Sequence, residues 1–126
     1  MTSEQPSIFN YSVVIPAYNE QNNIKPLLER IEKVMADVDG TYEIVIIDNG
    51  SFDGTPAILN ELVGKYPSLV IVTLSRNFGY DGAITTGLEY ARGSWVIIMD
   101  GDQQDPPEVI PQFIGKAKEG YDIVYG

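Results

Sequence analysis

Two hydrophobic patterns alternate along the chain. Short runs of mostly apolar, β-branched residues lie at positions 12–15, 43–47, 69–74, 95–99 and 122–125. Between them, apolar residues recur every three or four positions at 24–35, 58–66, 83–91 and 107–117. The runs predict strands buried on both faces, and the periodic segments predict amphipathic helices. Their alternation predicts an α/β fold with a Rossmann-like, mostly parallel sheet flanked by helices.

Local signals set the expected ends of these elements. Proline lacks a backbone N–H, so Pro16 is expected to end the first strand. Asp53 is expected to cap the second helix, whose first turn holds Pro56. Pro107 is expected to open the fourth helix.

The length fits one domain. Residues 11–126 are expected to fold as a unit behind a polar lead-in at residues 1–10. No apolar run approaches the roughly 20 residues that span a bilayer, and the amino terminus lacks the basic and apolar regions of a signal peptide. The expected location is the cytoplasm, or the cytoplasmic face of a membrane in a longer parent protein.

Composition narrows the chemistry that the chain can carry out. There is no cysteine and no histidine, and the formal net charge is −10. Disulfides, thiolate metal sites and the commonest zinc ligand are therefore excluded. A bound metal is expected to be a hard cation held by oxygen atoms, which indicates Mg²⁺ or Mn²⁺. Nucleic acid is not an expected partner, because so acidic a chain lacks a basic stripe.

Polar residues gather at the ends of the predicted strands. Four clusters lie at residues 16–20, 48–51, 75–79 and 100–105. In an open parallel sheet, ligands bind beyond the carboxyl ends of the strands. All four clusters are therefore expected to line one edge of the sheet and to form one binding site.

The last cluster, DGDQQD, suggests a metal site. In an extended segment Asp100, Asp102 and Gln104 point the same way, because side chains alternate. Two carboxylates this close repel each other unless a cation lies between them. Gly101 would let the backbone approach a ligand closely. Taken alone, the same triplet also fits a solvated acidic loop that caps the helix beginning at Pro107.

The other clusters also have ordinary structural interpretations. Asn19 and Glu20 fit the start of a helix, and the segment 48–51 fits a turn. Arg76 is a single base at the expected ligand edge, which favours contact with a phosphate or an acidic partner. The chain has no G-x-G-x-x-G after the first strand, which argues against a dinucleotide-binding dehydrogenase, and no G-x-x-x-x-G-K-[ST], which excludes a P-loop NTPase.

Four motifs together resemble a known family. They are VVIPAYNE (13–20), YEIVIIDNGSFDGT (42–55), LSRNFG (74–79) and MDGDQQDPPEVIP (99–111). In this order they resemble the family 2 inverting glycosyltransferases of the GT-A fold, closest to the polyprenyl- or dolichyl-phosphate sugar transferases. QDPPEVIP and GYDIVYG (120–126) support that subgroup. The resemblance covers nearly all of residues 11–126 and implies the nucleotide-sugar-binding half of the fold.

The resemblance, together with the clusters, assigns expected roles. The expected donor-binding residues are Pro16, Ala17, Tyr18, Glu20, Ile46, Asp48, Arg76, Gly101, Asp102 and Gln104. Of these, the resemblance implies nucleoside contacts for Pro16, Tyr18 and Glu20, and base or ribose contacts for Ile46 and Asp48. It also implies that Asp100, Asp102 and Gln104 hold Mg²⁺ or Mn²⁺ and the diphosphate, with the two aspartates as catalytic groups.

The chain departs from the family pattern at two positions and in length. Relatives often carry two aspartates where this chain has Asp48 and Asn49, and an apolar residue where Gln103 stands. Relatives also continue past the YDIVYG strand into parts that supply much of the acceptor site. The chain is therefore expected to be an N-terminal donor-binding portion, truncated on its C-terminal side.

The activity implied for the intact protein is metal-dependent, inverting sugar transfer. The donor would be a UDP- or GDP-sugar, and the acceptor a polyprenyl or dolichyl phosphate. Two alternatives remain open, namely nucleotide-sugar binding without turnover and transfer to a saccharide acceptor. In the first, a sheet edge left exposed by the truncation would also let two copies pair as a homo-oligomer.

Overall fold

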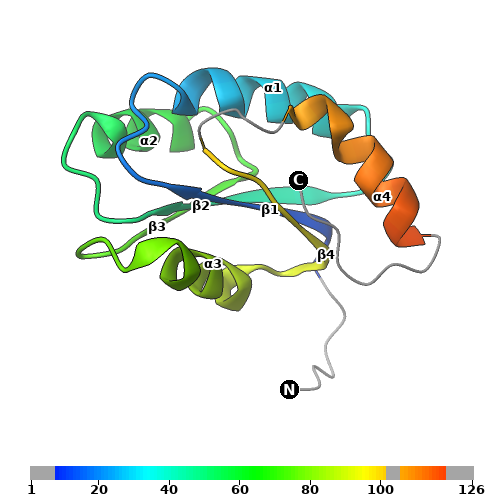
Figure 1. The fold of residues 1–126 in the computed structure, drawn as a ribbon. Coiled ribbons are helices and arrows are strands. Elements are labelled where there is room, and N and C mark those ends of the chain that lie inside the picture. The colour runs from blue at the N-terminus through cyan, green and yellow to red at the C-terminus, as the bar shows by residue number, and fades with distance from the viewer. Residues whose placement is uncertain (1–7, 102–105, 119–126) are drawn as a thin grey trace.

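The computed structural model describes residues 8–101 and 106–118, and the expected strand at 122–125 lies outside them. In chain order the elements are β1 (Phe9–Ala17), α1 (Ile24–Ala36), β2 (Tyr42–Asp48), α2 (Thr55–Val63), β3 (Leu69–Thr73), α3 (Gly79–Tyr90), β4 (Gly93–Ile98), the short 3₁₀ helix η1 (Pro107–Val109) and α4 (Ile110–Lys118). The four strands form one parallel sheet in the order β3-β2-β1-β4. Helices α1, α2 and α4 lie over one face and α3 over the other (Figure 1). The predicted α/β architecture is confirmed.

The central position of β1 determines which loops meet. Because β1 pairs with both β2 and β4, its carboxyl end lies between theirs, so the polar clusters that follow these three strands are neighbours. At its other end the strand begins earlier than expected. Phe9 pairs with Gly93, so the last two residues of the expected lead-in belong to the sheet.

Alternate residues of the strands form two hydrophobic layers. Val13, Ile15, Ile44 and Ile46 are fully buried against the apolar face of α1, which contributes Leu27, Leu28 and Ile31. On the opposite face, Val14, Val45 and Ile47 pack with Ala83 of α3. Each fully buried Val, Leu or Ile side chain contributes roughly 1.5–3 kcal/mol relative to an exposed one. These layers hold the carboxyl edge of the sheet in place.

The prediction that Pro16 ends the first strand is wrong. β1 continues to Ala17, and Pro16 pairs with Ile47 of β2. On the other side, the ladder with β4 stops at Val14, whose carbonyl accepts the N–H of Met99 at 3.0 Å. The next bond of that ladder would need an N–H from Pro16, which proline lacks. Pro16 therefore ends only the pairing of β1 with β4. The two strands stop pairing at the carboxyl edge of the sheet, where the polar clusters lie.

Helix α3 approaches the sheet closely at Gly87. A Cβ atom built on Gly87 would lie 2.4 Å from Cγ1 of Val14. Since Val14 is a fully buried branched side chain, we expect Gly87→Ala to destabilise the fold by about 1–3 kcal/mol despite the higher helix propensity of alanine. Gly115→Ala in α4 is the matched control, because no described atom lies within 4 Å of its added Cβ apart from its chain neighbours and the backbone of its own helix. Urea denaturation measures both variants, and equal stability of the two would contradict the close approach.

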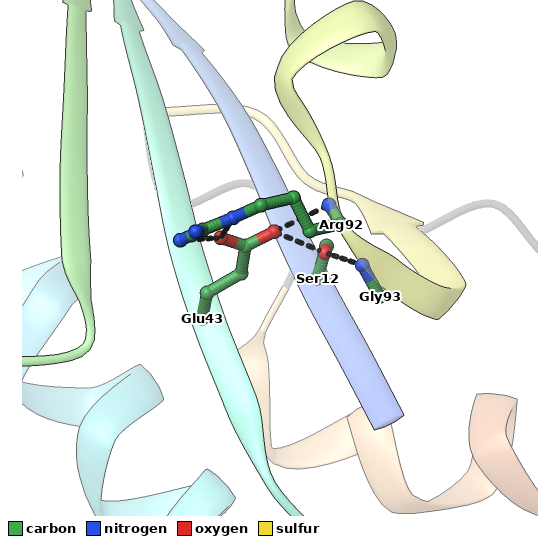
Figure 2. A network of polar contacts seen from close by, with 4 residues as sticks. All are labelled: Ser12, Glu43, Arg92 and Gly93. Carbon is green, nitrogen blue, oxygen red and sulfur yellow. Dashed lines mark hydrogen bonds and ion pairs between the residues drawn. The ribbon is translucent and has the colours of Figure 1, made fainter. Parts of the chain in front are cut away.

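A buried polar network joins the amino ends of three strands (Figure 2). Glu43 is only 1% exposed, and its Oε2 accepts hydrogen bonds from the Ser12 hydroxyl and the Arg92 backbone N–H, both at 2.6 Å. Its Oε1 accepts from Nε of Arg92 at 3.2 Å and from Nη2 at 3.0 Å. The Ser12 hydroxyl in turn accepts the N–H of Gly93 at 2.7 Å. The network thus links β1, β2 and the α3–β4 junction at the edge of the sheet opposite the polar clusters.

Candidate nucleotide-sugar site

A cavity of about 400 Å³ lies at the carboxyl edge of the sheet. Its lining residues are Pro16, Ala17, Tyr18, Glu20, Asn49, Asn77, Gly79, Tyr80, Asp100 and Gly101. They come from all four polar clusters and from the first turn of α3. The expectation that the clusters share one edge of the sheet therefore agrees with the geometry.

The loop after β1 is locked to the loop after β2. Asn19 adopts a left-handed conformation with φ of 52°, and its Oδ1 accepts the N–H groups of Phe52 at 3.0 Å and Asp53 at 3.4 Å. In return, the N–H of Asn19 donates to the Ser51 hydroxyl at 2.9 Å. Asparagine tolerates positive φ better than most residues, because its short side chain can hydrogen-bond locally. These reciprocal bonds fix the position of Tyr18, the neighbouring cavity residue.

Asp53 braces the same junction but does not cap α2 as expected. The helix begins at Thr55 with Gly54 as its N-cap residue. The Asp53 carboxylate accepts the N–H of Thr55 at 2.9 Å, its hydroxyl at 2.6 Å, and the N–H of Gln21 at 3.3 Å. Desolvation opposes ionisation, but these hydrogen bonds outweigh it and lower the pKa of Asp53. Asp53 thus connects two loops instead of closing the end of one helix.

Six of the expected site residues line the cavity. They are Pro16, Ala17, Tyr18, Glu20, Asp100 and Gly101. Tyr18 is 39% exposed, and its ring meets that of Phe52 edge to face with centroids 6.0 Å apart. A Cβ on Gly101 would lie 3.1 Å from the carbonyl oxygen of Pro16, so a larger residue here would require this part of the wall to shift slightly. Asp102 and Gln104 lie outside the described residues.

Three other expected site residues do not line the cavity. The side chain of Ile46 is fully buried in the core beneath the edge and offers no surface to a ligand. Asp48 is 1% exposed, and its carboxylate accepts the N–H of Ser51 at 3.1 Å, which shapes the turn. Arg76 is exposed, with its guanidinium 4.2 Å from the centroid of the Phe78 ring. A stacked guanidinium keeps its charge for a phosphate partner, but here it lies outside the lining.

The cavity also contains residues that sequence reasoning did not select. Asn49, Asn77, Gly79 and Tyr80 line it, whereas the sequence favoured their neighbours Asp48 and Arg76. The motif LSRNFG and its place after β3 were the available signals. Arg76 is the charged residue of that motif, whereas the motif contributes the neutral residues Asn77 and Gly79 to the cavity wall.

The chemistry of the lining fits a hard divalent cation in part. Asp100 and Glu20 bring two carboxylate side chains to the cavity, and oxygen ligands suit Mg²⁺ and Mn²⁺. Within residues 8–101 and 106–118, no three acidic side chains gather closely enough to hold a metal. The other expected ligands, Asp102 and Gln104, fall in the undescribed segment between these ranges. The metal role of this triplet therefore stays a prediction.

The segment that follows the acidic turn is anchored to α1. Arg30 and Glu108 form an ion pair, with Nη2–Oε1 and Nε–Oε2 distances of 2.5 and 3.1 Å. The hydrogen bond from Arg30 lowers the pKa of Glu108, and the same bond raises that of Arg30. Pro107 and Ile110, which flank Glu108 in the sequence, are buried. The ion pair thus connects η1 to α1.

This chain is similar in sequence and in fold to known proteins. The model of glycosyl transferase family 2 matches residues 12–126. A protein of Synechocystis described as an uncharacterized glycosyltransferase is 46% identical over 117 residues, which cover 90% of this chain and 36% of that protein. The undecaprenyl-phosphate 4-deoxy-4-formamido-L-arabinose transferase of Klebsiella pneumoniae is 42% identical over 120 residues, covering 94% and 37%. The chain thus spans about a third of the length of these curated relatives.

Solved structures of glycosyltransferases superpose on the same core. The mannosyltransferase PcManGT of Pyrobaculum calidifontis, in complex with GDP-Man and Mn²⁺, gives a TM-score of 0.68 at 28% identity and covers 79% of this chain and 31% of that one. TarS 1-349 of S. aureus, in complex with UDP-GlcNAc, gives 0.68 at 26% identity, with coverages of 87% and 31%. No described helix is both long and apolar enough to cross a bilayer. The family resemblance of the motifs is confirmed, and this chain belongs to glycosyl transferase family 2 as part of a GT-A glycosyltransferase.

Proposed function

We propose that the cavity binds a UDP- or GDP-sugar together with Mg²⁺ or Mn²⁺. In the intact protein, this domain would supply the donor site for inverting transfer of the sugar to a polyprenyl phosphate. The observation that carries the proposal is the meeting of Asp100, Glu20 and Tyr18 in one cavity at the carboxyl edge of a parallel sheet. The relatives named for undecaprenyl phosphate and the neighbours solved with GDP-Man and UDP-GlcNAc support it.

Tyr18, Asp100 and Gly101 of the lining would each have a distinct task. The half-exposed ring of Tyr18 offers an apolar face to a nucleobase, and it is held by the locked loops around Asn19. Asp100 would share the cation with Asp102 and Gln104, and Gly101 would let the diphosphate approach the backbone. A bound divalent cation would stabilise the negative charge that develops on the leaving nucleoside diphosphate.

A phosphate acceptor would need no histidine from this chain. The second pKa of a phosphate monoester is about 6, so such an acceptor is already anionic near neutral pH. It needs little help from a general base before it attacks the anomeric carbon. Inversion then follows from a single displacement on the face opposite the departing diphosphate.

The alternative of binding without turnover keeps the same site. It is favoured by the coverage of only 36–37% of these relatives, since the acceptor groups would belong to the remaining two thirds. Association of two copies through an edge strand of the sheet stays a prediction of this alternative. Release of free sugar, or transfer to undecaprenyl phosphate, by residues 1–126 alone would exclude it.

Asp100→Asn tests the metal-dependent donor site. Because the substitution keeps the shape and removes one anionic oxygen ligand, we expect calorimetry with Mn²⁺ and a UDP- or GDP-sugar to show at least about tenfold weaker binding. EDTA should weaken binding to the wild-type domain to a similar level. Asp39→Asn is the matched control, because Asp39 is exposed at the opposite edge of the sheet, and it should bind as the wild type does. Metal-dependent binding that survives Asp100→Asn would contradict the role of Asp100.

A further inference from the structure

The side chain of Asn49 links the end of β2 to the loop between β3 and α3. It is 5% exposed and directly follows the last residue of β2. Its Nδ2 donates to Oδ1 of Asn77 at 3.2 Å and to the carbonyl of Gly79 at 3.0 Å. Its Oδ1 accepts the N–H of Phe78 at 3.0 Å. One amide thus contacts three successive residues of this loop.

The partners determine which way the amide faces. The N–H of Phe78 can only donate and the carbonyl of Gly79 can only accept, so the oxygen must face the first and the nitrogen the second. Oδ1 of Asn77 also accepts the N–H of Gly79 at 2.7 Å, which fixes it as an acceptor. An aspartate at position 49 would keep the bond from Phe78 but would turn an ionised oxygen toward two other oxygens. Only a neutral amide satisfies all three contacts near neutral pH.

The loop held in this way forms one wall of the cavity. Asn77 and Gly79 line it, and Tyr80 follows on the first turn of α3. We propose that Asn49, where relatives often carry an aspartate, is a positioning residue for this wall, and that in this chain its amide N–H₂ group holds the loop in place. The inference rests on the proposed function for the identity of the ligand, but the positioning of the loop is testable without any ligand.

Asn49→Asp tests the requirement for the N–H₂ group. In ¹H–¹⁵N spectra at about pH 7.5, we expect displaced resonances for Phe78, Gly79 and Tyr80, because two donor bonds are lost. As the pH falls toward about 4, the aspartate of the variant takes up a proton and can donate again. The loop resonances should then move back toward their wild-type positions. A residue with only a packing role would show no such return.

Nucleotide binding gives the second readout. At about pH 7.5, calorimetry with Mn²⁺ and UDP or GDP should show about tenfold weaker binding for Asn49→Asp than for the wild type. Asn49→Ala removes the same links without adding charge, so it should also weaken binding and thereby exclude simple repulsion of the diphosphate. Asn60→Asp adds the same charge at an exposed position of α2 and should bind within about twofold of the wild type.

The outcomes separate the two proposals. If the wild-type domain binds neither nucleotide, the proposed function fails, while the loop resonances still decide whether Asn49 positions the wall. Unchanged resonances in both Asn49 variants would overturn the positioning role. Displaced resonances with unchanged nucleotide affinity would overturn it as well, because the wall would then be irrelevant to binding.

Discussion

Arg92→Ala is expected to lower the free energy of unfolding by about 3 kcal/mol, one of the two largest losses predicted for this domain. Its guanidinium is the countercharge of the Glu43 carboxylate, which is 1% exposed and lies between β1 and β2. Removing one partner of a buried pair costs about 3–5 kcal/mol, because the other charge stays buried without compensation. The lower end applies here, since the Arg92 side chain is 48% exposed and water can enter where it is removed.

Two comparisons make this prediction specific. Lys65→Ala breaks the exposed pair with Glu61, whose N–O distance is 3.5 Å, and should cost no more than about 0.5 kcal/mol. Adding Glu43→Gln to Arg92→Ala removes the uncompensated charge, so the double variant should be more stable than the sum of the two single losses implies. Denaturant unfolding of the wild type, Arg92→Ala, Glu43→Gln and the double variant measures this coupling, and Lys65→Ala is unfolded beside them as the control. Strict additivity, or a loss for Arg92→Ala as small as that for Lys65→Ala, would contradict the role of the network.

Much of the fold follows from local patterns in the sequence. Continuous apolar runs are typical of parallel strands, and the periodic segments are typical of helices that cover them, so the alternation was enough to predict the layers. The rule that ligands bind at the carboxyl ends of strands then placed four polar clusters at one edge. That rule correctly predicted the cavity positions of Tyr18, Glu20 and Asp100.

Contacts between distant segments account for what the sequence did not predict. Nothing in the sequence near Glu43 indicates that its partner is Arg92, 49 residues later. From the sequence alone, Glu43 is therefore interpreted only as the first residue of a strand. Likewise, the sequence around Asn49 is typical of an ordinary turn, and only the fold places the loop that contains Asn77 next to it. The prediction that Pro16 ends the strand failed for a related reason. The N–H that proline lacks would have faced β4, so the pairing with β2 is unaffected.

Gly50→Ala is expected to disturb both the stability and the site. Gly50 has φ of 75°, and a Cβ there would lie 2.4 Å from the carbonyl carbon of Arg76 and 2.6 Å from the nitrogen of Asn77. Since these are backbone atoms, no side-chain rotation relieves the clash, and the loops after β2 and β3 must separate. Left-handed strain of about 1–2 kcal/mol and overpacking of about 1–3 kcal/mol together predict a loss of roughly 3 kcal/mol.

Gly79→Ala separates the two causes of this loss. Gly79 also has positive φ, 82°, but apart from its chain neighbours and its own helix backbone no described atom lies within 4 Å of its added Cβ. It should show only the conformational part, about 1–2 kcal/mol in thermal or urea unfolding. Separation of the loops in Gly50→Ala would also pull the Phe78 N–H away from the Asn49 amide, so nucleotide affinity should fall at temperatures where the variant is still folded. Equal stability of Gly50→Ala and Gly79→Ala would contradict the close approach of Gly50 to the backbone of Arg76 and Asn77. The contact between the loops after β2 and β3 would then not be what shapes the cavity wall.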